Sequence, residues 1–243
     1  MAQDEHTTAT EVNIDSFSDG EMVDHYVERT DVGLFEQEER AIERYFGEDG
    51  RLLDVGCGAG RTTAPLSDRG YDVVGIDISA DMVERARALF PDLTFEIGDV
   101  TDLDYSDDAF EYVVFAHNGI DYVHPESERE RAFREIRRVL TDDGVLVFST
   151  HNAWYRYPAL VSDHSFLRTF YVGNGNLKRF FRRYKVDVIE DDPLWTYLTT
   201  PPRQFRQLRR CGFDPVEVVG KRDGLARYFE AMPHFVAEPD SEQ

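Results

Sequence analysis

The sequence predicts an α/β protein built around a doubly wound, mostly parallel sheet. Three observations indicate this class. Short apolar runs alternate with helical patterns, one apolar run breaks into alternating glycines at residues 56–60, and residues 110–115 are nearly all apolar, as in a strand buried on both faces. A chain of 243 residues with 41% hydrophobic residues suits one sizeable core. We therefore expect a single domain over residues 16–243.

The expected elements follow in chain order. The polar, aperiodic residues 1–15 predict a disordered tail, and helical patterns predict N-terminal helices within residues 18–47. Ser79 is expected to cap a helix that ends at Pro91, and Pro125 to open another. Five strands are expected, at 51–55, 71–76, 93–97, 110–115 and 145–149. An inserted cap is expected at about 152–198, followed by a helix after Thr200 and by two strands at 215–219 and 228–237.

The charge is unusual for a protein of this size. The formal net charge is −21, and of the 27 basic residues only Lys178, Lys185 and Lys221 are lysine. This composition resembles that of cytoplasmic proteins from salt-loving archaea, in which concentrated salt screens the repulsion. An ordinary acidic enzyme is the alternative.

Several other classes of protein are not expected. No run approaches the roughly 20 apolar residues of a membrane span, and no secretory signal pattern is present, so we expect a cytoplasmic protein without membrane contact. The only cysteines, Cys57 and Cys211, have neither disulfide-framework nor metal-ligand spacing. We therefore expect no metal.

The glycine-rich turn is the strongest functional motif. A dinucleotide-binding turn has its third glycine three residues after the second, but here that position is Arg61. The sequence Asp54-Val-Gly-Cys-Gly-Ala-Gly60 instead resembles motif I of class I S-adenosylmethionine-dependent methyltransferases. The resemblance implies a seven-stranded Rossmann-like sheet with an antiparallel last strand, and S-adenosylmethionine as the cofactor.

Acidic residues follow the next two expected strands, as motifs II and III of this family would require. The resemblance implies that Asp77 accepts hydrogen bonds from the ribose hydroxyls and that Asp99 and the Val100 backbone hold the adenine. Asp77 as part of a helix cap, and Met82 as ordinary core, are the alternatives. The full set of expected cofactor residues is Asp54, Gly56, Cys57, Gly58, Gly60, Asp77, Ile78, Met82, Asp99, Val100, Phe115, Ala116 and Tyr26.

The ends of the fourth and fifth strands supply the candidates for catalysis and substrate binding. His117 is a candidate general base, because a histidine pKa of about 6.5 suits proton transfer, although it could serve only as a hydrogen-bonding group. His151 and Tyr155 are further catalytic candidates. Asn152 and Trp154 are expected at the substrate mouth, or else in packing of the cap onto the sheet.

A basic window in the cap contrasts with the acidic chain. Residues 164–186 contain no Asp or Glu, and aromatic residues interleave with cations that include Arg182 and Arg183. One hypothesis is that these two arginines bind an anionic substrate. Nucleic-acid binding is a second hypothesis, disfavoured by the net charge, and internal charge balance is the third.

Together these observations predict an enzyme that transfers a methyl group from S-adenosylmethionine to an oxygen, nitrogen or carbon atom of a small molecule. In-line alignment of the reacting groups can supply much of the acceleration, so the enzyme does not need a strong general base. The sequence therefore does not reveal the acceptor. A non-catalytic cofactor-binding regulator and a nicotinamide-dependent oxidoreductase are the alternatives. We expect no nucleic-acid partner, and a monomer or homodimer.

Overall fold

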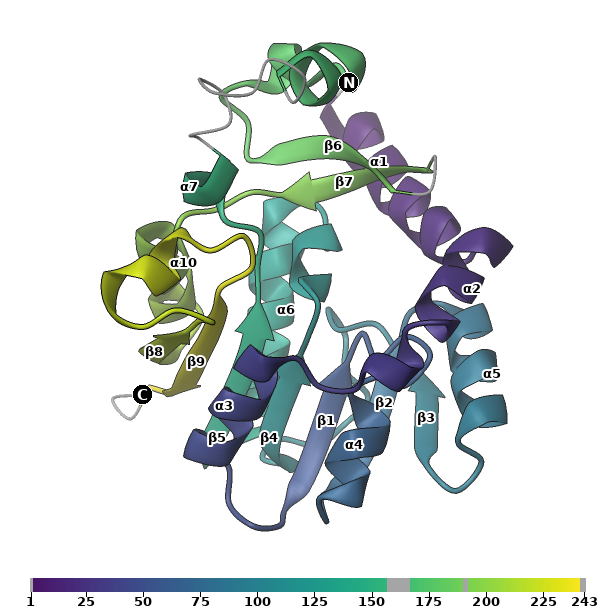
Figure 1. Ribbon diagram of the computed structural model, residues 1–243, viewed down its shortest axis with the longest axis vertical. Helices are drawn as coiled ribbons and strands as arrows, with labels where there is room; N and C mark the ends of the chain where they lie inside the picture. Colours follow the sequence, from purple (N-terminus) through teal and green to yellow (C-terminus); the bar gives the residue numbers. More distant parts are fainter. Residues whose placement is uncertain (1, 157–166, 190–191, 241–243) are drawn as a thin grey trace.

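A seven-stranded sheet forms the centre of the protein. The computed structural model describes residues 2–156, 167–189 and 192–240. The strands lie in the order β3-β2-β1-β4-β5-β9-β8 (Figure 1). Their bounds are β1 (Arg51–Val55), β2 (Asp72–Asp77), β3 (Thr94–Ile97), β4 (Phe110–Phe115), β5 (Leu140–Ser149), β8 (Phe213–Val219) and β9 (His234–Pro239).

The pairing confirms the predicted fold class. Strands β3, β2, β1, β4 and β5 are parallel to one another, whereas β9 runs antiparallel to both β5 and β8. The order of the strands reverses between β1 and β4, because β2 and β3 lie on one side of β1 and the later strands lie on the other. In open α/β sheets such a reversal creates a crevice at the carboxyl ends of the strands, and ligands bind there.

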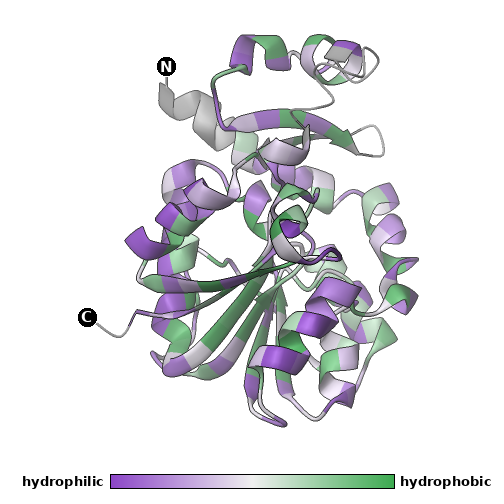
Figure 2. Ribbon diagram, turned by 60° about the vertical axis from the view of Figure 1, so that its left-hand side comes forward, coloured by the Kyte–Doolittle hydropathy of each residue, from purple (hydrophilic) through white to green (hydrophobic). Residues whose placement is uncertain are grey.

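Helices cover both faces of the sheet, as Figure 1 shows. Leu53, Val113 and Phe148 point to one face, where they pack with Phe133 of α6 and Leu208 of α10. The opposite face carries residues such as Leu52 and Val73 and is covered by α3, α4 and α5. The central strands are mostly apolar, whereas the helices alternate apolar and polar residues (Figure 2). The helices are α3 (Glu36–Tyr45), α4 (Thr63–Asp68), α5 (Ala80–Leu89), α6 (Glu126–Val139) and α10 (Pro201–Arg210).

Local sequence explains where several helices begin. Ser79 accepts a hydrogen bond from the Met82 backbone and so caps α5, as predicted. Pro201 and Pro202 occupy the first turn of α10, where their missing N–H groups leave no helical hydrogen bond unmade. The last strand begins later than predicted, because residues Gly224–Phe229 form the helical turn η5 and β9 starts only at His234.

The N-terminal segment differs from the prediction. Instead of a disordered tail over residues 1–15, the structure has helix α1 (Ala2–Phe17), followed by α2 (Gly20–Val27) and the turn η1 (Thr30–Val32). The predicted tail is therefore wrong. The physical reason is tertiary: the amide of Asn13 bonds the backbone of Tyr122 and Trp195, and Thr10 bonds the carbonyl of His124. Sequence periodicity contains no signal for such contacts.

A cap lies above the carboxyl edge of the sheet. It contains α7 (Ala153–Arg156), the helical turns η3 (Leu167–Gly173) and η4 (Asn176–Arg179), and an antiparallel pair, β6 (Tyr184–Ile189) and β7 (Asp192–Tyr197). Helix α1 packs beside β7, so the N-terminal end of the chain lies against the cap (Figure 1).

Candidate functional site

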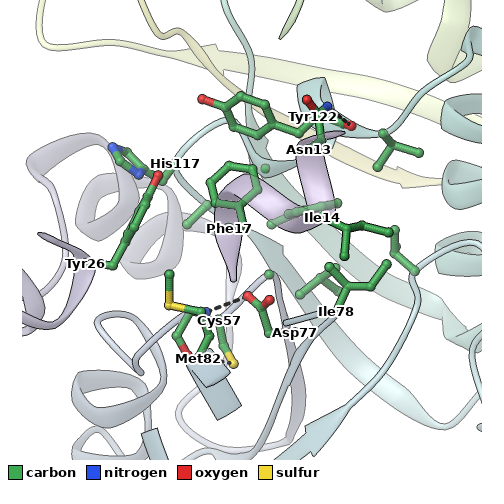
Figure 3. A pocket seen from close by; sticks show the side chains of 18 of the residues that line it. Asn13, Ile14, Phe17, Tyr26, Cys57, Asp77, Ile78, Met82, His117 and Tyr122 are labelled. Carbon is green, nitrogen blue, oxygen red and sulfur yellow. Dashed lines mark hydrogen bonds between the residues drawn. The ribbon is translucent and has the colours of Figure 1, made fainter. Parts of the chain in front are cut away.

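A cavity of about 610 Å³ opens at the carboxyl ends of β1, β2, β3 and β4. Its floor comes from the loops that follow these strands, and its other walls come from α1, α2 and residues 122–125. Figure 3 shows Asp77, Met82 and Cys57 on the opposite side of the cavity from Asn13 and Tyr122. The volume lies within the range of about 300–1,000 Å³ typical of small-molecule sites.

The glycine turn forms one wall with its backbone. Gly56 and Gly58 have φ values of +62° and +53°, which residues other than glycine rarely adopt. A Cβ on Gly56 would lie 2.9 Å from the ring of Phe115. A Cβ on Gly58 would meet no protein atom within 4 Å, because Gly58 lines the cavity. The open space beside Gly58 is therefore available to a ligand.

Asp77 is the carboxylate at the floor of the cavity. Its two oxygens accept hydrogen bonds from the backbone N–H of Gly58 and of Ser79, each at 2.9 Å. Burial raises the pKa of this carboxyl, and the backbone donors oppose that shift. Ile78 and Met82 line the cavity beside it and present apolar surface.

The loop after β3 contributes a second acid. Asp99 and Val100 both line the cavity, and the carboxylate of Asp99 accepts hydrogen bonds from the backbone and the hydroxyl of Thr101, both at 2.8 Å. The cavity therefore has acidic groups at the ends of two adjacent strands, as predicted from the positions of Asp77 and Asp99.

The N-terminal helices close the cavity. Tyr26 lines it, and burial raises the pKa of its hydroxyl to about 12, so the phenol stays protonated. Arg29 and Arg61 add positive charge to the same wall. Sequence reasoning missed both arginines and Phe17, and it missed Asn13 and Ile14 because they belong to the segment predicted to be disordered.

His117 lines the cavity at the end of β4. Its backbone is left-handed, with φ +50°, and its ring lies 5.8 Å from that of Tyr26 and 5.9 Å from that of Phe35. Burial, with help from the positive charge of Arg61, lowers the pKa of its imidazole to about 4. His117 is therefore neutral at physiological pH and a weak proton acceptor. Phe115 and Ala116 also line the cavity.

Two of the expected cofactor residues lie outside the cavity wall. Asp54 is fully buried and accepts hydrogen bonds from the hydroxyls of Thr62 and Thr63, both at 2.6 Å. Strand alternation explains this, because Asp54 shares a face with Leu52 and points toward the start of α4, whereas Val55 points into the cavity. A Cβ on Gly60 would lie 3.0 Å from the ring of Phe90, so this glycine permits close packing.

The expected substrate residues also lie away from the cavity. Asn152 is buried and donates to the carbonyls of Tyr228 and Glu230, and Trp154 stacks on Phe229 at 5.2 Å. These contacts agree with the packing alternative. Tyr155, expected as catalytic, is 55% exposed and does not line the cavity. His151, also expected as catalytic, does not line the cavity either.

The cations of the basic window mainly contact groups of the protein itself, most of them within the cap. Arg183 pairs with Glu126, and the ammonium of Lys185 bonds backbone carbonyls in the segment 179–182. Arg179 stacks on Trp195 with 4.6 Å between its guanidinium carbon and the ring centroid. Neither Arg182 nor Arg183 lines the cavity, so their expected role in substrate binding has no support in the geometry. Residues 164–166 lie outside the described residues.

The cavity lining fits S-adenosylmethionine. Asp77 offers a carboxylate for ribose hydroxyls, Asp99 and the Val100 backbone suit an adenine, and Ile78 and Met82 suit its apolar faces. The open space beside Gly58 leaves room for the ligand against exposed backbone. In residues 2–156, 167–189 and 192–240 no cluster of three metal-ligating side chains occurs, and no helix is long and apolar enough to cross a bilayer.

Comparisons with known proteins agree with this lining. Residues 52–144 match a family described as "Methyltransferase domain". The fold is the Rossmann-like methyltransferase fold. An S-adenosylmethionine-dependent methyltransferase from Methanosarcina mazei has a TM-score of 0.69 at 20% identity, covering 86% of this chain and 100% of its own.

Two further proteins are informative. The Burkholderia thailandensis 1,6-didemethyltoxoflavin-N1-methyltransferase, solved with 1,6-didemethyltoxoflavin and S-adenosylhomocysteine bound, has a TM-score of 0.63 at 16% identity, covering 98% of this chain and 90% of its own. The putative methyltransferase YqeM of Bacillus subtilis is 28% identical over 123 residues, 49% of this chain and 50% of that protein. The chain spans about half the length of the curated relatives it matches. S-adenosylmethionine is the cofactor that these comparisons support.

Proposed function

We propose that this protein is an S-adenosylmethionine-dependent methyltransferase whose acceptor is a small molecule. The observation that carries the proposal is the cavity itself. It places the acidic residues Asp77 and Asp99 beside an open glycine turn, at the reversal of strand order where ligands of open α/β sheets bind. When bound, the cofactor supplies a methyl carbon made electrophilic by its positively charged sulfur.

The residues that line the cavity are proposed to hold and orient the cofactor. We propose that Asp77 accepts hydrogen bonds from both ribose hydroxyls, and that Asp99 and the Val100 backbone hold the adenine. The guanidinium of Arg29 is proposed to pair with the carboxylate at the amino-acid end of the cofactor, because Arg29 lines the cavity and arginine grips carboxylates well.

The acceptor is proposed to be small because α1, α2 and residues 122–125 wall the cavity. Ile14, Phe17, Phe35 and Tyr122 give that end of the cavity an apolar and aromatic lining. Such a wall excludes water and orients a flat ligand, and orientation alone can contribute several kcal/mol to a bimolecular reaction.

The acidic surface supports a second part of the proposal, that the protein is adapted to concentrated salt. Its formal net charge is −21, and three lysines among 27 basic residues leave arginine as the main cation. Screening by salt would relieve the repulsion among the acids.

Ligand binding tests the proposed function. Isothermal titration calorimetry should give a single site for S-adenosylhomocysteine and no heat with NAD, and labelled S-adenosylmethionine should deliver its methyl group to a member of a small-molecule acceptor pool. Binding of NAD alone would overturn the proposal in favour of an oxidoreductase. Tight binding of S-adenosylhomocysteine without transfer to any acceptor would instead indicate a non-catalytic binding protein.

A further inference from the structure

The outer end of the cap carries exposed apolar side chains. The turns η3 and η4 and the two residues after them form this end, drawn in green above β6 and away from the central sheet in Figure 1. Phe181 is 97% exposed, and Val172, Leu177 and Phe180 are exposed by between 48 and 63%. Large apolar side chains that gather in this way mark an interaction surface, whereas singly scattered ones do not.

Cations lie among these apolar side chains. Residues 164–186 hold six of the 27 basic residues of the chain and no acidic residue, although the formal net charge of the chain is −21. Arg168 in η3 and Lys178 in η4 are exposed. The outer end of the cap is therefore both apolar and cationic. We call the following residues the cap patch: Arg168, Val172, Leu177, Lys178, Phe180 and Phe181.

The backbone beneath the cap patch is held by buried polar groups. The side-chain amide of Asn176 is completely buried and donates to the carbonyls of Phe170 and Val186, at 2.9 and 2.7 Å. Its oxygen accepts the N–H of Val186 at 2.8 Å. The ammonium of Lys185 donates to carbonyls of the segment 179–182. Both turns are therefore tied to β6, and the exposed side chains project from a fixed base.

The charge of the cap patch argues against a second copy of the chain as its partner. In a twofold dimer the same surface meets itself, so Arg168 and Lys178 of one copy would lie near the cations of the other. A head-to-tail contact with the acidic remainder of another copy would build rings or open chains and not a dimer. The partner that fits is an anionic surface of another kind.

The mixture of side chains favours a lipid surface. Residues 177–182 read Leu-Lys-Arg-Phe-Phe-Arg, so apolar and cationic side chains interleave. The centres of protein–protein interfaces are depleted of charged residues, lysine included. Sites for single-stranded nucleic acid stack bases on aromatic rings, but Val172 and Leu177 are aliphatic and offer no such platform. Phenylalanine and leucine beside lysine and arginine are typical of the boundary between acyl chains and anionic headgroups.

We propose that the cap patch docks the protein on a bilayer that contains anionic lipids. Phe181 and Leu177 insert among the acyl chains, and Arg168 and Lys178 lie against the headgroups. All 48 acidic residues lie outside residues 164–186. Their repulsion from the lipid is screened beyond about 8 Å at 0.15 M salt, so the local charge of the cap patch dominates the contact.

Docking of this kind revises one expectation from the sequence. No membrane contact was expected because no apolar run is long enough to span a bilayer. A protein that lies on the surface needs no such run, since a few inserted apolar side chains and a few cations hold it at the interface. The residues of the cap patch do not line the cavity, so docking and cofactor binding can succeed or fail independently.

Flotation of the protein with lipid vesicles tests the docking. In 0.15 M KCl the protein should bind vesicles of equal parts phosphatidylglycerol and phosphatidylcholine at least about fivefold more tightly than vesicles of phosphatidylcholine alone. Phe181→Ser should weaken binding to the mixed vesicles by about tenfold or more, because burying a phenylalanine side chain contributes at least about that factor. Leu225→Ser should bind as wild type. It is the matched control, because Leu225 is 79% exposed in η5, outside the cap patch.

The cations give a second readout. Lys178→Gln should weaken binding to the mixed vesicles by about fivefold in 0.15 M KCl, because one lysine near an anionic surface contributes roughly that factor. This loss should vanish in 2 M KCl, where the Debye length falls below about 3 Å, whereas the loss in Phe181→Ser should persist. Lys221→Gln is the matched control, since Lys221 is an exposed lysine that follows β8.

Several results would overturn the docking. They are no binding of wild type to the mixed vesicles, equal losses in Phe181→Ser and Leu225→Ser, and tighter binding to a single-stranded oligonucleotide than to the vesicles. A wild-type dimer that Phe181→Ser converts to a monomer would assign the cap patch to a second copy instead. If wild type binds the vesicles but not S-adenosylhomocysteine, the proposed function is wrong and the docking stands.

Discussion

Glu38 is a buried charge that ties α3 to the glycine turn. Only 1% of its side chain is exposed, and Arg61 donates to both of its oxygens, at 2.8 and 2.9 Å. One of these oxygens also accepts the backbone N–H of Phe35 at the start of α3. The guanidinium of Arg61 reaches the carbonyl of Gly33 as well, so one arginine orders the segment between the N-terminal helices and the cavity.

This pair predicts a loss of stability in acid. Burial by itself would raise the pKa of Glu38, but hydrogen bonds from Arg61 and the proximity of His234 outweigh it and lower the pKa from 4.5 to about 2. A carboxyl with a lowered folded pKa contributes stability above its unfolded pKa, and that contribution disappears as the pH falls from about 4.5 toward 2. The difference corresponds to roughly 3 kcal/mol.

Urea unfolding of wild type and Glu38→Gln at several pH values measures this effect. The variant should be less stable at pH 6, and the gap in free energy of unfolding should narrow by about 3 kcal/mol as the pH falls to 2. Glu39→Gln is the matched control, because Glu39 is the next residue and its side chain is 47% exposed. A gap that stays constant with pH would contradict the account of Glu38.

At this scale the sequence predicts some site residues and misses others for physical reasons. Gly56, Asp77 and Asp99 follow strands, and the carboxyl ends of parallel strands meet at one edge of the sheet, so their positions in the cavity follow from chain order. Asp54 points away because a strand alternates its side chains. The burial of Glu38 depends on a partner 23 residues away and has no local signature.

Helix α1 is an element whose position could not be predicted from local sequence. Its sequence is polar and carries no strong helical stripe, yet it forms a wall of the cavity. Its position depends on Asn13, which is 4% exposed and bonds the N–H and the carbonyl of Trp195 at 2.7 and 3.0 Å, and the carbonyl of Tyr122 at 2.8 Å. One side chain thus joins α1 to β7 and to the loop after β4.

Asn13→Ala should release this element. Losing the side chain leaves three backbone groups without their partner, at roughly 1–3 kcal/mol in total where water can replace the bonds. We expect hydrogen exchange in α1 to accelerate and the affinity for S-adenosylhomocysteine to fall by about fivefold or more. Asp15→Ala, an exposed change on the same helix, is the control. Unchanged exchange in α1 of Asn13→Ala would show that other contacts hold the helix.

The boundaries of the cap could be predicted from sequence, but the partners of its cations could not. Its boundaries follow from the loss of strand and helix alternation after His151, and the structure places a separate two-stranded sheet there. The partners of its cations are not predictable, because Arg183 pairs with Glu126 at the start of α6, far away in the chain.

Charge is the dominant property at the scale of the whole molecule. The net charge of −21 lies mostly on exposed acids, whereas two cations of the cap, Arg183 and Lys185, are held by Glu126 of α6 and by backbone carbonyls of the cap. In dilute buffer the repulsion among exposed acids acts over about 10 Å at 0.1 M salt, but over only about 3 Å at 1 M. Salt should therefore stabilise the folded chain.

Thermal unfolding in dilute buffer and in 2 M KCl tests this expectation. The midpoint should be higher in KCl, and the gain should exceed that of a protein of near-zero net charge measured in the same two buffers. A midpoint no higher in KCl would show that the acidic composition is not an adaptation to salt.

In the proposed function, the cavity at the strand ends binds S-adenosylmethionine through Asp77. The most direct measurement is calorimetric titration of S-adenosylhomocysteine into wild type, Asp77→Asn and Asp72→Asn, whose changed carboxyl is 79% exposed at the other end of the same strand. Hydrogen bonds to a charged group contribute about 1.5–3 kcal/mol, so Asp77→Asn should weaken binding by about 10- to 100-fold while Asp72→Asn binds as wild type. Equal affinity in all three proteins, or binding of NAD in place of S-adenosylhomocysteine, would contradict the claim.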